Sequence, residues 1–319
     1  MRGIVHIWLI ILLLLSSFGF TINRLQDPDF LVSQAREVSL YNRVVNKYDT
    51  FLPKDLINNG QLSADEMKQV LTYAIDGETF YSILHDYLAA YLDYYTGRSS
   101  KLYFGYDLTK INTRAKTKTT EILSARYYNS LPECKSDQLR DWSMENSLPS
   151  CRLAKTNVAQ TDIDRQLSTL SEKLFKDMPT SIVVDSASNS AKRTRTIVSI
   201  DVKVNYALWI ITGVLTLLYL LIRRRKAFLP LGIISLLVGG LEVGISFFAW
   251  DYLAKNIVDY AANKQDWAAY STMIADVTDL TAQVLKTSLG TIAIFTLGTG
   301  MACIILAIFN RAKKIVPAV

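Results

Sequence analysis

The chain has 319 residues, of which 50% are hydrophobic and 20% charged, and its 35 Lys and Arg against 29 Asp and Glu give a net charge of +6. So many apolar residues exclude a disordered chain, and three Cys and 14 Gly exclude a disulfide scaffold and a fibrous repeat. The basic balance alone would fit a nucleic-acid partner, but a mean hydropathy of +0.17 favours a membrane protein with a large soluble part.

The first apolar stretch, Ile4 to Phe20, follows a single basic residue, Arg2. It fits an N-terminal membrane anchor. It also fits a secretory signal peptide, because Ser17 and Gly19 have the small-x-small spacing of a cleavage site after Gly19. Both alternatives stay open, and both leave the following segment outside.

Residues 21–205 are long enough for a folded domain, and their pattern is mainly helical. Asp27 and Pro28 predict a helix start, and apolar residues recur at helical spacing as far as Tyr48. Further start, stop and periodicity signals predict helices that open at the capping-box pair Ser63 and Glu66, end near Gly97, and cover about 107–129 and 161–177. Ile182 to Val184 is the one convincing short strand.

Aromatic residues are dense between Tyr73 and Tyr128. Four of them share a helix face and are expected to fill the core: Phe80, Tyr87, Tyr91 and Tyr95. Three others lie in a predicted loop, where a ring offers a flat face and a polar tip to a glycan, peptidoglycan or apolar ligand. These candidates for ligand or partner contacts are Tyr103, Phe104 and Tyr106.

Two of the three cysteines, Cys134 and Cys151, lie in the outer segment, each two residues after a proline. In an oxidising compartment this pair favours a disulfide, with two free thiols as the alternative. Cys303 lies in an apolar stretch and is expected to be inert packing.

Three later stretches have the length and low charge of a bilayer span: Tyr206 to Ile222, Phe228 to Trp250, and Ser288 to Phe309. The helical pattern continues outward from the second and last spans, so a helical stalk is expected. Short basic segments set the orientation, because positive residues stay in the cytoplasm. The residues that anchor this topology are Arg223, Arg224, Arg225, Lys226, Arg311, Lys313 and Lys314.

Four short features together resemble an uncharacterised family of bacterial four-span envelope proteins. They are the frame Leu131-Pro132-Glu133-Cys134, the pair Cys151-Arg152, the turn Met178-Pro179-Thr180-Ser181 and the membrane hairpin with its basic turn. The resemblance covers most of the chain. It implies a four-span architecture and a bacterial envelope context, and it implies no reaction.

Catalytic motifs are missing from the sequence: it has no GxxxxGK[ST] phosphate loop, no GxGxxG, no HExxH and no GxSxG. Only His6 and His85 are present, which disfavours histidine triads and multi-histidine metal sites. The carboxylate pair Asp27 and Asp29 lacks a third ligand and fits a helix start better than a metal site. No metal or cofactor is therefore expected, and the chain is not expected to be an enzyme.

Glu242 is the only acidic residue well inside a span, slightly outward of its midplane. Depth matching places Thr212 and Thr296 near the same level, so either hydroxyl could hydrogen-bond it. Gly240 and Gly244 flank it with the small-xxx-small spacing that lets helices approach closely. A protonated carboxyl that holds helices together, a proton or cation relay, and an outer water-filled crevice remain the alternatives.

The predicted fold is mainly α: a multi-span helical membrane protein with a helical extracytoplasmic domain between the first and second spans. In chain order we expect an anchor or signal peptide (1–20), the extracytoplasmic domain (21–205), a span (206–222), a cytoplasmic basic turn (223–227), a span (228–250), an extracytoplasmic helical loop (251–287), a span (288–309) and a cytoplasmic tail (310–319).

The expected function is non-enzymatic. The extracytoplasmic domain of a bacterial cytoplasmic-membrane protein would bind a partner protein or an envelope ligand, and the alternative is a transporter or channel component that uses Glu242. The expected partners are the lipid bilayer and either another envelope membrane protein or a second copy of the chain. Nucleic acid is not expected, because the basic excess lies in the short cytoplasmic segments.

Overall fold

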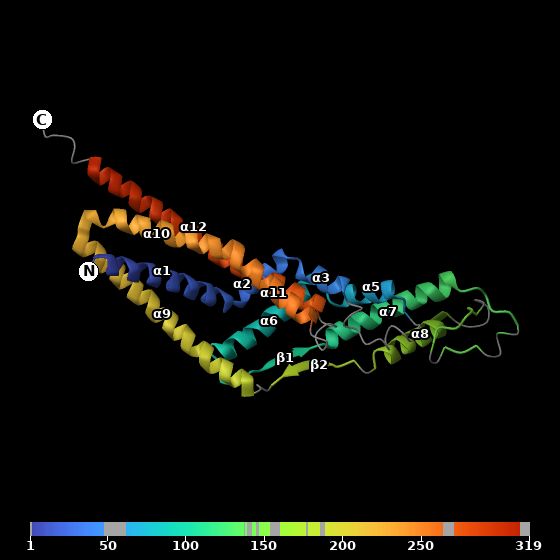
Figure 1. Ribbon diagram of the computed structural model, residues 1–319. Coiled ribbons are helices and arrows are strands. Elements are labelled where there is room, and N and C mark those ends of the chain that lie inside the picture. Colours follow the sequence, from blue (N-terminus) through green and yellow to red (C-terminus); the bar gives the residue numbers. More distant parts are fainter. Residues whose placement is uncertain are drawn as a thin grey trace. The chain divides into compact units, whose positions relative to one another are not determined.

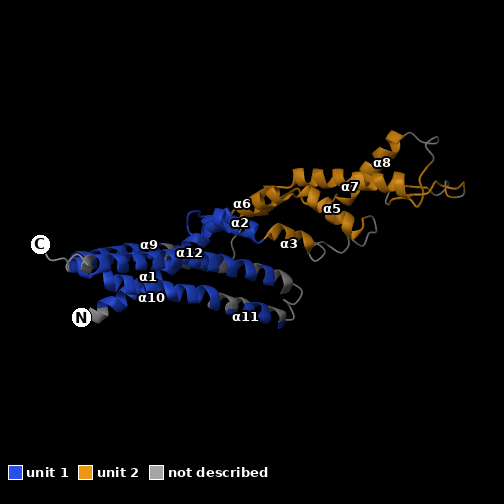
Figure 2. Cartoon of the chain, turned by 90° about the horizontal axis from the view of Figure 1, so that it is seen from above, with its two compact units in different colours: residues 1–38, 88–102, 187–319 blue, residues 39–87, 103–186 orange. Residues whose placement is uncertain are grey.

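The computed structural model describes residues 2–47, 62–136, 138, 142–144, 147–153, 160–176, 178–185, 189–263 and 271–312. Helices dominate these residues, which confirms the prediction of a mainly α chain (Figure 1). The chain forms two compact units (Figure 2). Unit 1 comprises residues 1–38, 88–102 and 187–319, and unit 2 comprises residues 39–87 and 103–186, so residues 21–205 contribute to both.

Unit 1 is built from long helices that lie side by side (Figure 1). Its main elements are α1 (Arg2–Leu25), α2 (Pro28–Glu37), α9 (Asn189–Arg223), α10 (Phe228–Gly244), α11 (Trp250–Asn263) and α12 (Ser271–Ala312). The 3-10 turn η2 (Arg224–Lys226) joins α9 to α10, and the π-helical segment η3 (Ile245–Ala249) joins α10 to α11. Helices α9 and α12 run without a break past the predicted outer ends of their spans, which confirms that these spans continue as helical stalks.

In the described part of the chain, four helices are long and apolar enough to cross a membrane: Val5–Leu25, Lys203–Lys226, Phe228–Phe248 and Thr278–Phe309. Their outward side chains are apolar and exposed, as in Ile222 at 80% and Ile294 at 73%. Such a surface is expected to face lipid tails, because the exposure of apolar surface to water costs roughly 25 cal/mol per Å² of free energy. The chain is therefore a multi-pass membrane protein.

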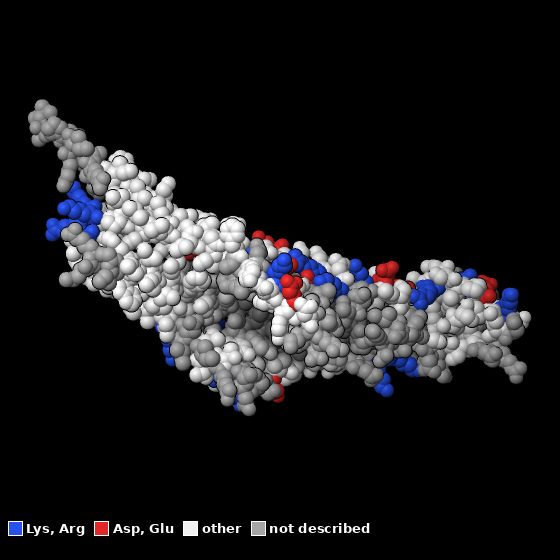
Figure 3. All heavy atoms as spheres, viewed as in Figure 1, with Lys and Arg blue, Asp and Glu red and all other residues white. Residues whose placement is uncertain are grey.

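Charged and aromatic residues mark the two ends of these spans. Lys and Arg gather where α9 turns into α10, beside an uncharged surface over the helices (Figure 3). Towards the other end, exposed rings lie on α9 and on α10–η3: Tyr206, Trp209, Phe247 and Phe248. By helical rise, Tyr206 and Phe247 lie about 26 and 29 Å from the turn. That spacing matches a hydrocarbon core of ~30 Å with an aromatic belt at its edge.

The helix α6 (Gly77–Tyr95) ends in unit 1 at a cap provided by α9. Gly97 follows the helix with φ of 81°, the left-handed conformation that glycine adopts without strain. The Arg195 side chain of α9 donates to the Tyr94 carbonyl at 3.1 Å and to the Ser99 carbonyl at 3.0 Å. The guanidinium also lies over the Tyr94 ring. A cation at a helix C-terminus satisfies carbonyl groups that have no intrahelical partner, so Arg195 stabilises this end of α6.

Unit 2 has a core like that of a soluble protein. Its helices are α3 (Leu40–Asn46), α5 (Ala64–Ala74), α7 (Thr109–Ser130) and α8 (Gln160–Leu174), with the first part of α6. The core residues Val70, Leu123, Leu167 and Leu170 are at most 1% exposed. Apolar side chains at helical spacing on α5, α7 and α8 meet there, and their burial provides the main stabilisation of this unit.

Side-chain contacts fix the helix ends and connect the helices in unit 2. Ser63 and Glu66 form the predicted capping box of α5, with the Ser63 amide donating to the Glu66 carboxylate at 2.7 Å. The same carboxylate pairs with Arg126 of α7. Partial burial raises the pKa of Glu66, but hydrogen bonds from Ser63 and Arg126 lower it more, so the pKa lies below its usual value.

One local prediction for the chain around the start of unit 2 was wrong. The helix expected from Pro28 towards Tyr48 is broken between α2 and α3, because Ser39 adopts a left-handed conformation with φ of 54°. Beyond the break, the Tyr41 hydroxyl donates to the Ile75 carbonyl at 2.8 Å, which joins α3 to the end of α5. The break coincides with the boundary between the two units, so a long-range contact overrides the local helical pattern.

Candidate functional site

The predicted loop around Tyr103 is a strand. β1 (Phe104–Asp107) pairs antiparallel with β2 (Ser181–Val184), with Phe104 opposite Val184 and Gly105 opposite Val183. β2 agrees with the strand expected at 182–184, and β1 was missed. Hydrogen bonds from Thr109 hold the pKa of Asp107 below its usual value, and they mark where β1 gives way to α7. We refer to β1, β2 and Tyr103 as the ribbon.

The two faces of the ribbon differ, because successive side chains in a strand point to opposite sides. Phe104 is only 5% exposed and meets the Tyr87 ring edge-on, with centroids 5.3 Å apart. Phe104 is therefore a core residue, which corrects its assignment as a contact residue. Tyr106 is half-buried and lies opposite Ile182.

The other face of the ribbon is open and carries two exposed apolar side chains beside the polar Asp107 and Ser181. Tyr103 is 64% exposed and Val183 is 55% exposed. The Tyr103 side chain extends over Gly105, where an added Cβ would lie 2.9 Å from the tyrosine hydroxyl oxygen. Gly105 is thus the residue that lets the Tyr103 ring lie across the strand, close to Val183 on the paired strand. This arrangement offers an aromatic ring and a β-branched side chain to a partner.

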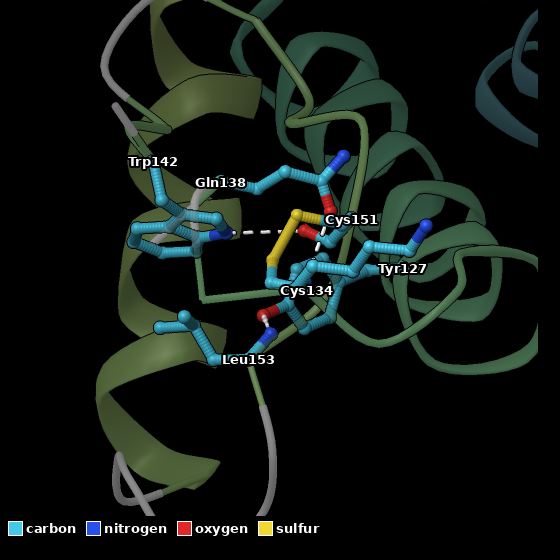
Figure 4. Close-up of a disulfide and its surroundings, with 7 residues drawn as sticks. Tyr127, Cys134, Gln138, Trp142, Cys151 and Leu153 are labelled. Carbon is cyan, nitrogen blue, oxygen red and sulfur yellow. Dashed lines mark hydrogen bonds between the residues drawn. A yellow bond between two sulfur atoms is a disulfide. The ribbon is translucent and has the colours of Figure 1, made fainter. Parts of the chain in front are cut away.

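The predicted disulfide between Cys134 and Cys151 is present. The chain segments on both sides of it are paired: the Cys134 amide donates to the Arg152 carbonyl at 2.9 Å, and the Arg152 amide donates to the Pro132 carbonyl at 2.8 Å. The Trp142 indole donates to the Cys151 carbonyl at 3.1 Å (Figure 4). The bridge therefore closes a loop whose two ends are also held by backbone hydrogen bonds.

The disulfide loop is attached to the core of unit 2 by Tyr127. This residue is 1% exposed, and its hydroxyl accepts a hydrogen bond from the Leu153 amide at 2.9 Å (Figure 4). The neighbouring Tyr128 donates to Asp164 of α8 at 3.0 Å, and burial together with that carboxylate raises the pKa of Tyr128 to about 12.

An open hollow of about 510 Å³ lies beside Tyr127 and Tyr128 and is lined in part by Arg152. The Arg152 guanidinium contacts the Tyr128 carbonyl and Glu133, so it is already engaged.

Glu242 lies on α10 inside unit 1 and is fully buried. Neither carboxylate oxygen has a hydrogen-bond partner among the described residues. The hydroxyls of Ser17 on α1 and Thr296 on α12 are the neighbours of its carboxyl group, although neither forms a hydrogen bond with it. Thr212 is placed elsewhere: its hydroxyl bonds Ser16 at 2.9 Å and so joins α9 to α1.

The glycines that bring α10 and α12 together are not the predicted ones. An added Cβ at Gly240 or Gly244 would meet nothing within 4 Å. At Gly232 it would lie 2.9 Å from the Gly300 carbonyl oxygen, and at Gly239 it would lie 2.7 Å from Leu297. The face of α10 that carries Gly232 and Gly239 is therefore the face that approaches α12 closely. Gly240 and Gly244 lie on another face of the helix.

The basic residues predicted to anchor the topology lie at one end of unit 1. Arg224, Arg225 and Lys226 form η2 and are exposed, and the Arg223 guanidinium lies over the Tyr219 ring. Arg311 is in the last turn of α12. The remaining two, Lys313 and Lys314, lie outside the described residues. The start of α1 and the end of α12 lie at the same end of the unit as η2 (Figure 1).

Ser17 and Val183 were missed as site residues. In the sequence, Ser17 and Gly19 carry the small-x-small signal of a cleavage site. In the structure Ser17 faces Glu242, and Gly19 makes room for Asn205, whose Oδ1 would lie 2.6 Å from an added Cβ. Buried small residues on a membrane helix are a signal of helix packing that could have revealed these contacts.

Comparisons with protein-family models, curated proteins and solved structures found no match to this chain.

Proposed function

We propose that this chain is a protein of the bacterial cytoplasmic membrane that binds a partner protein or an envelope ligand through its extracytoplasmic part, without catalysing a reaction. The exposed face of the ribbon carries the proposal. There the exposed Tyr103 ring lies over β1 and the exposed Val183 side chain lies on the paired strand β2, so two large apolar residues are side by side at the surface of unit 2. An exposed apolar surface of this kind is costly in water and is typical of contact surfaces.

The orientation belongs to the same proposal. Positive residues in the short turn between α9 and α10 and at the end of α12 favour a cytoplasmic position for that end of unit 1. The aqueous segment between α1 and α9 then lies outside, in an oxidising compartment. The disulfide in this segment agrees with that location, since such bonds persist where thiols are not kept reduced.

The test is site-specific photo-crosslinking in intact cells, with a photoreactive phenylalanine analogue in place of Tyr103 or Val183. The matched control carries the analogue at Tyr73, which is 50% exposed on α5 of the same unit. We expect Tyr103 and Val183 to give the same discrete adduct and Tyr73 to give none. We also expect Val183→Lys to abolish the adduct formed from Tyr103.

Two outcomes would contradict the binding role of the ribbon. One is an equal adduct from all three positions, which would indicate contact without a specific surface. The other is a folded, disulfide-bonded protein that gives no adduct from either ribbon position.

A further inference from the structure

We propose that Glu242 is a proton-binding site within the membrane: its carboxyl group holds a proton at neutral pH and donates it to the hydroxyl of Ser17 on α1 or of Thr296 on α12, which ties α10 to the helix that accepts the hydrogen bond.

The position of Glu242 makes an ionised carboxylate costly. By helical rise the residue lies about 21 Å from the start of α10 at Phe228, well inside the apolar part of the bundle. Its side chain is fully buried, and neither oxygen has a hydrogen-bond partner in the described part of the chain. An unpaired charge in such surroundings is avoided by binding a proton or by pairing with a cation.

The neighbouring hydroxyls indicate that a proton is needed. Ser17 donates its single hydroxyl hydrogen to the Leu13 carbonyl at 3.0 Å, and Thr296 donates its own to the Ile292 carbonyl at 3.0 Å. Both hydroxyls therefore present oxygen lone pairs to Glu242. A carboxylate would meet these lone pairs with its own, whereas a protonated carboxyl group can donate to them. A single proton can bond one of the two hydroxyl oxygens at a time, so the contacts favour a protonated Glu242 with either Ser17 or Thr296 as its acceptor.

Among the side chains that the structure describes, no charged one takes the place of that proton. Within the described residues, the polar side chains beside the carboxyl group are those of Ser17 and Thr296, and both are uncharged. The titratable groups on the elements packed against α10 lie at least about 10 Å along their helices from the site, by helical rise. They are His6 and Arg24 of α1, Arg224, Arg225 and Lys226 of η2, and Asp276, Asp279, Lys286 and Cys303 of α12.

The site also depends on α1. Ser17 belongs to the segment that the sequence allows to be either an anchor or a cleaved signal peptide. The same helix is joined to α9 through Ser16 and Thr212, and through His6, which bonds the Tyr219 hydroxyl at 2.7 Å. The proposed site therefore exists only if the mature chain keeps residues 1–19. Its intact mass is expected to include them, and a mature chain that begins at Phe20 would overturn the proposal.

Infrared difference spectroscopy tests the proton directly, on the full-length protein in lipid nanodiscs at neutral pH. A protonated carboxyl group has a higher carbonyl stretching frequency than a carboxylate. We expect the spectrum of the wild type minus Glu242→Gln to contain a protonated-acid band that moves to lower frequency in D2O. Carboxylate bands in its place would overturn the proposal. So would bands that change on addition of Na⁺, Li⁺ or K⁺, since a metal cation would then occupy the site.

Matched threonine variants test the hydrogen bond without removing the acid. Thr296→Val removes the acceptor hydroxyl and is expected to raise the carbonyl frequency of the acid band. Thr299→Val is the control, because Thr299 lies one turn away on α12, is exposed and also bonds its own helix. Equal spectra for both variants and the wild type would contradict the donation to Thr296, and the same comparison with Ser17→Ala tests the contact to α1.

Discussion

The two units of the chain differ in where most of their large apolar residues lie and in how many small polar residues they bury. Unit 2 buries large aliphatic residues such as Leu167 and Leu170. Unit 1 exposes residues of the same kind along its four long helices and, beside an apolar cluster that includes Leu231 and Val238, buries small polar residues, among them Ser16, Thr212, Ser246 and Ser288. Water drives apolar side chains into a core, whereas lipid gives them no reason to be inside, so helices in a bilayer associate through small residues and hydrogen bonds. The same chain therefore follows different packing rules in its two units.

The largest expected effect is a core truncation in unit 2. Leu167→Ala removes a side chain with no exposed surface and should lower the free energy of unfolding of unit 2 by about 2–5 kcal/mol. Ile222→Ala is the matched change in unit 1, where the side chain is 80% exposed, and it should alter stability by less than about 0.5 kcal/mol. Amide hydrogen exchange in nanodiscs measures both. Equal losses would show that the lipid-facing surface had been misassigned.

The disulfide comes next. Replacing Cys134 and Cys151 together by serine should destabilise unit 2 by roughly 3 kcal/mol, because the bridge closes a loop with a sequence separation of 17. The control is Cys303→Ser in α12, which breaks no bond. Thermal unfolding monitored by near-UV circular dichroism provides the readout. An unchanged melting temperature in the double serine variant would mean that the hydrogen bonds around Trp142 and Arg152 hold the loop alone.

Glycine substitutions in α10 test the packing rule of unit 1. Gly232→Ala brings a methyl group against the Gly300 carbonyl and should destabilise the α10–α12 contact by about 1–3 kcal/mol. Gly240→Ala adds the same methyl group in open space and should be neutral or slightly stabilising, since alanine favours helix. Unfolding in mixed micelles compares the two. The reverse order of stability would place the close contact on the other face of α10.

The smallest expected effect is electrostatic. The pKa of Glu66 in the folded chain is lower than its ordinary value of 4.5. The ionised carboxylate therefore stabilises unit 2 at pH values above 4.5. This contribution, about 1 kcal/mol or less for a partly exposed pair, is lost as the pH falls through the folded pKa. The stability difference between wild type and Glu66→Gln should therefore shrink below pH 4.5. A difference that stays constant between pH 7 and pH 3 would exclude the Glu66 carboxylate as its source.

Local signals in the sequence predicted the long apolar helices, the capping box at Ser63 and Glu66, and the pair Cys134 and Cys151. Each of these depends on residues close together in the chain or on composition alone. The helix that begins at Pro28 was also predicted, together with its N-cap Asp27. The structure confirms this cap, because the Asp27 carboxylate accepts a hydrogen bond from the Asp29 amide. These features need no knowledge of tertiary contacts.

Features that depend on which face a helix or strand turns inward were not predictable in the same way. Gly240 and Gly244 have the same spacing signal as other small-residue pairs, but the rotation of α10 brings Gly232 and Gly239 to α12 instead. The strand at Phe104 becomes regular only because β2, far along the chain, pairs with it. Such choices are set by long-range contacts, which a local pattern does not contain.

The most direct test of the contrast between the units is cysteine labelling in intact cells, in a Cys303→Ser background. Tyr103→Cys places a thiol on the ribbon of unit 2, and Arg225→Cys places one in the basic turn of unit 1. With a membrane-impermeant maleimide, the proposed topology predicts that Tyr103→Cys is labelled from outside and that Arg225→Cys is labelled only after the membrane is permeabilised. Labelling of Arg225→Cys in intact cells, with Tyr103→Cys protected, would contradict it.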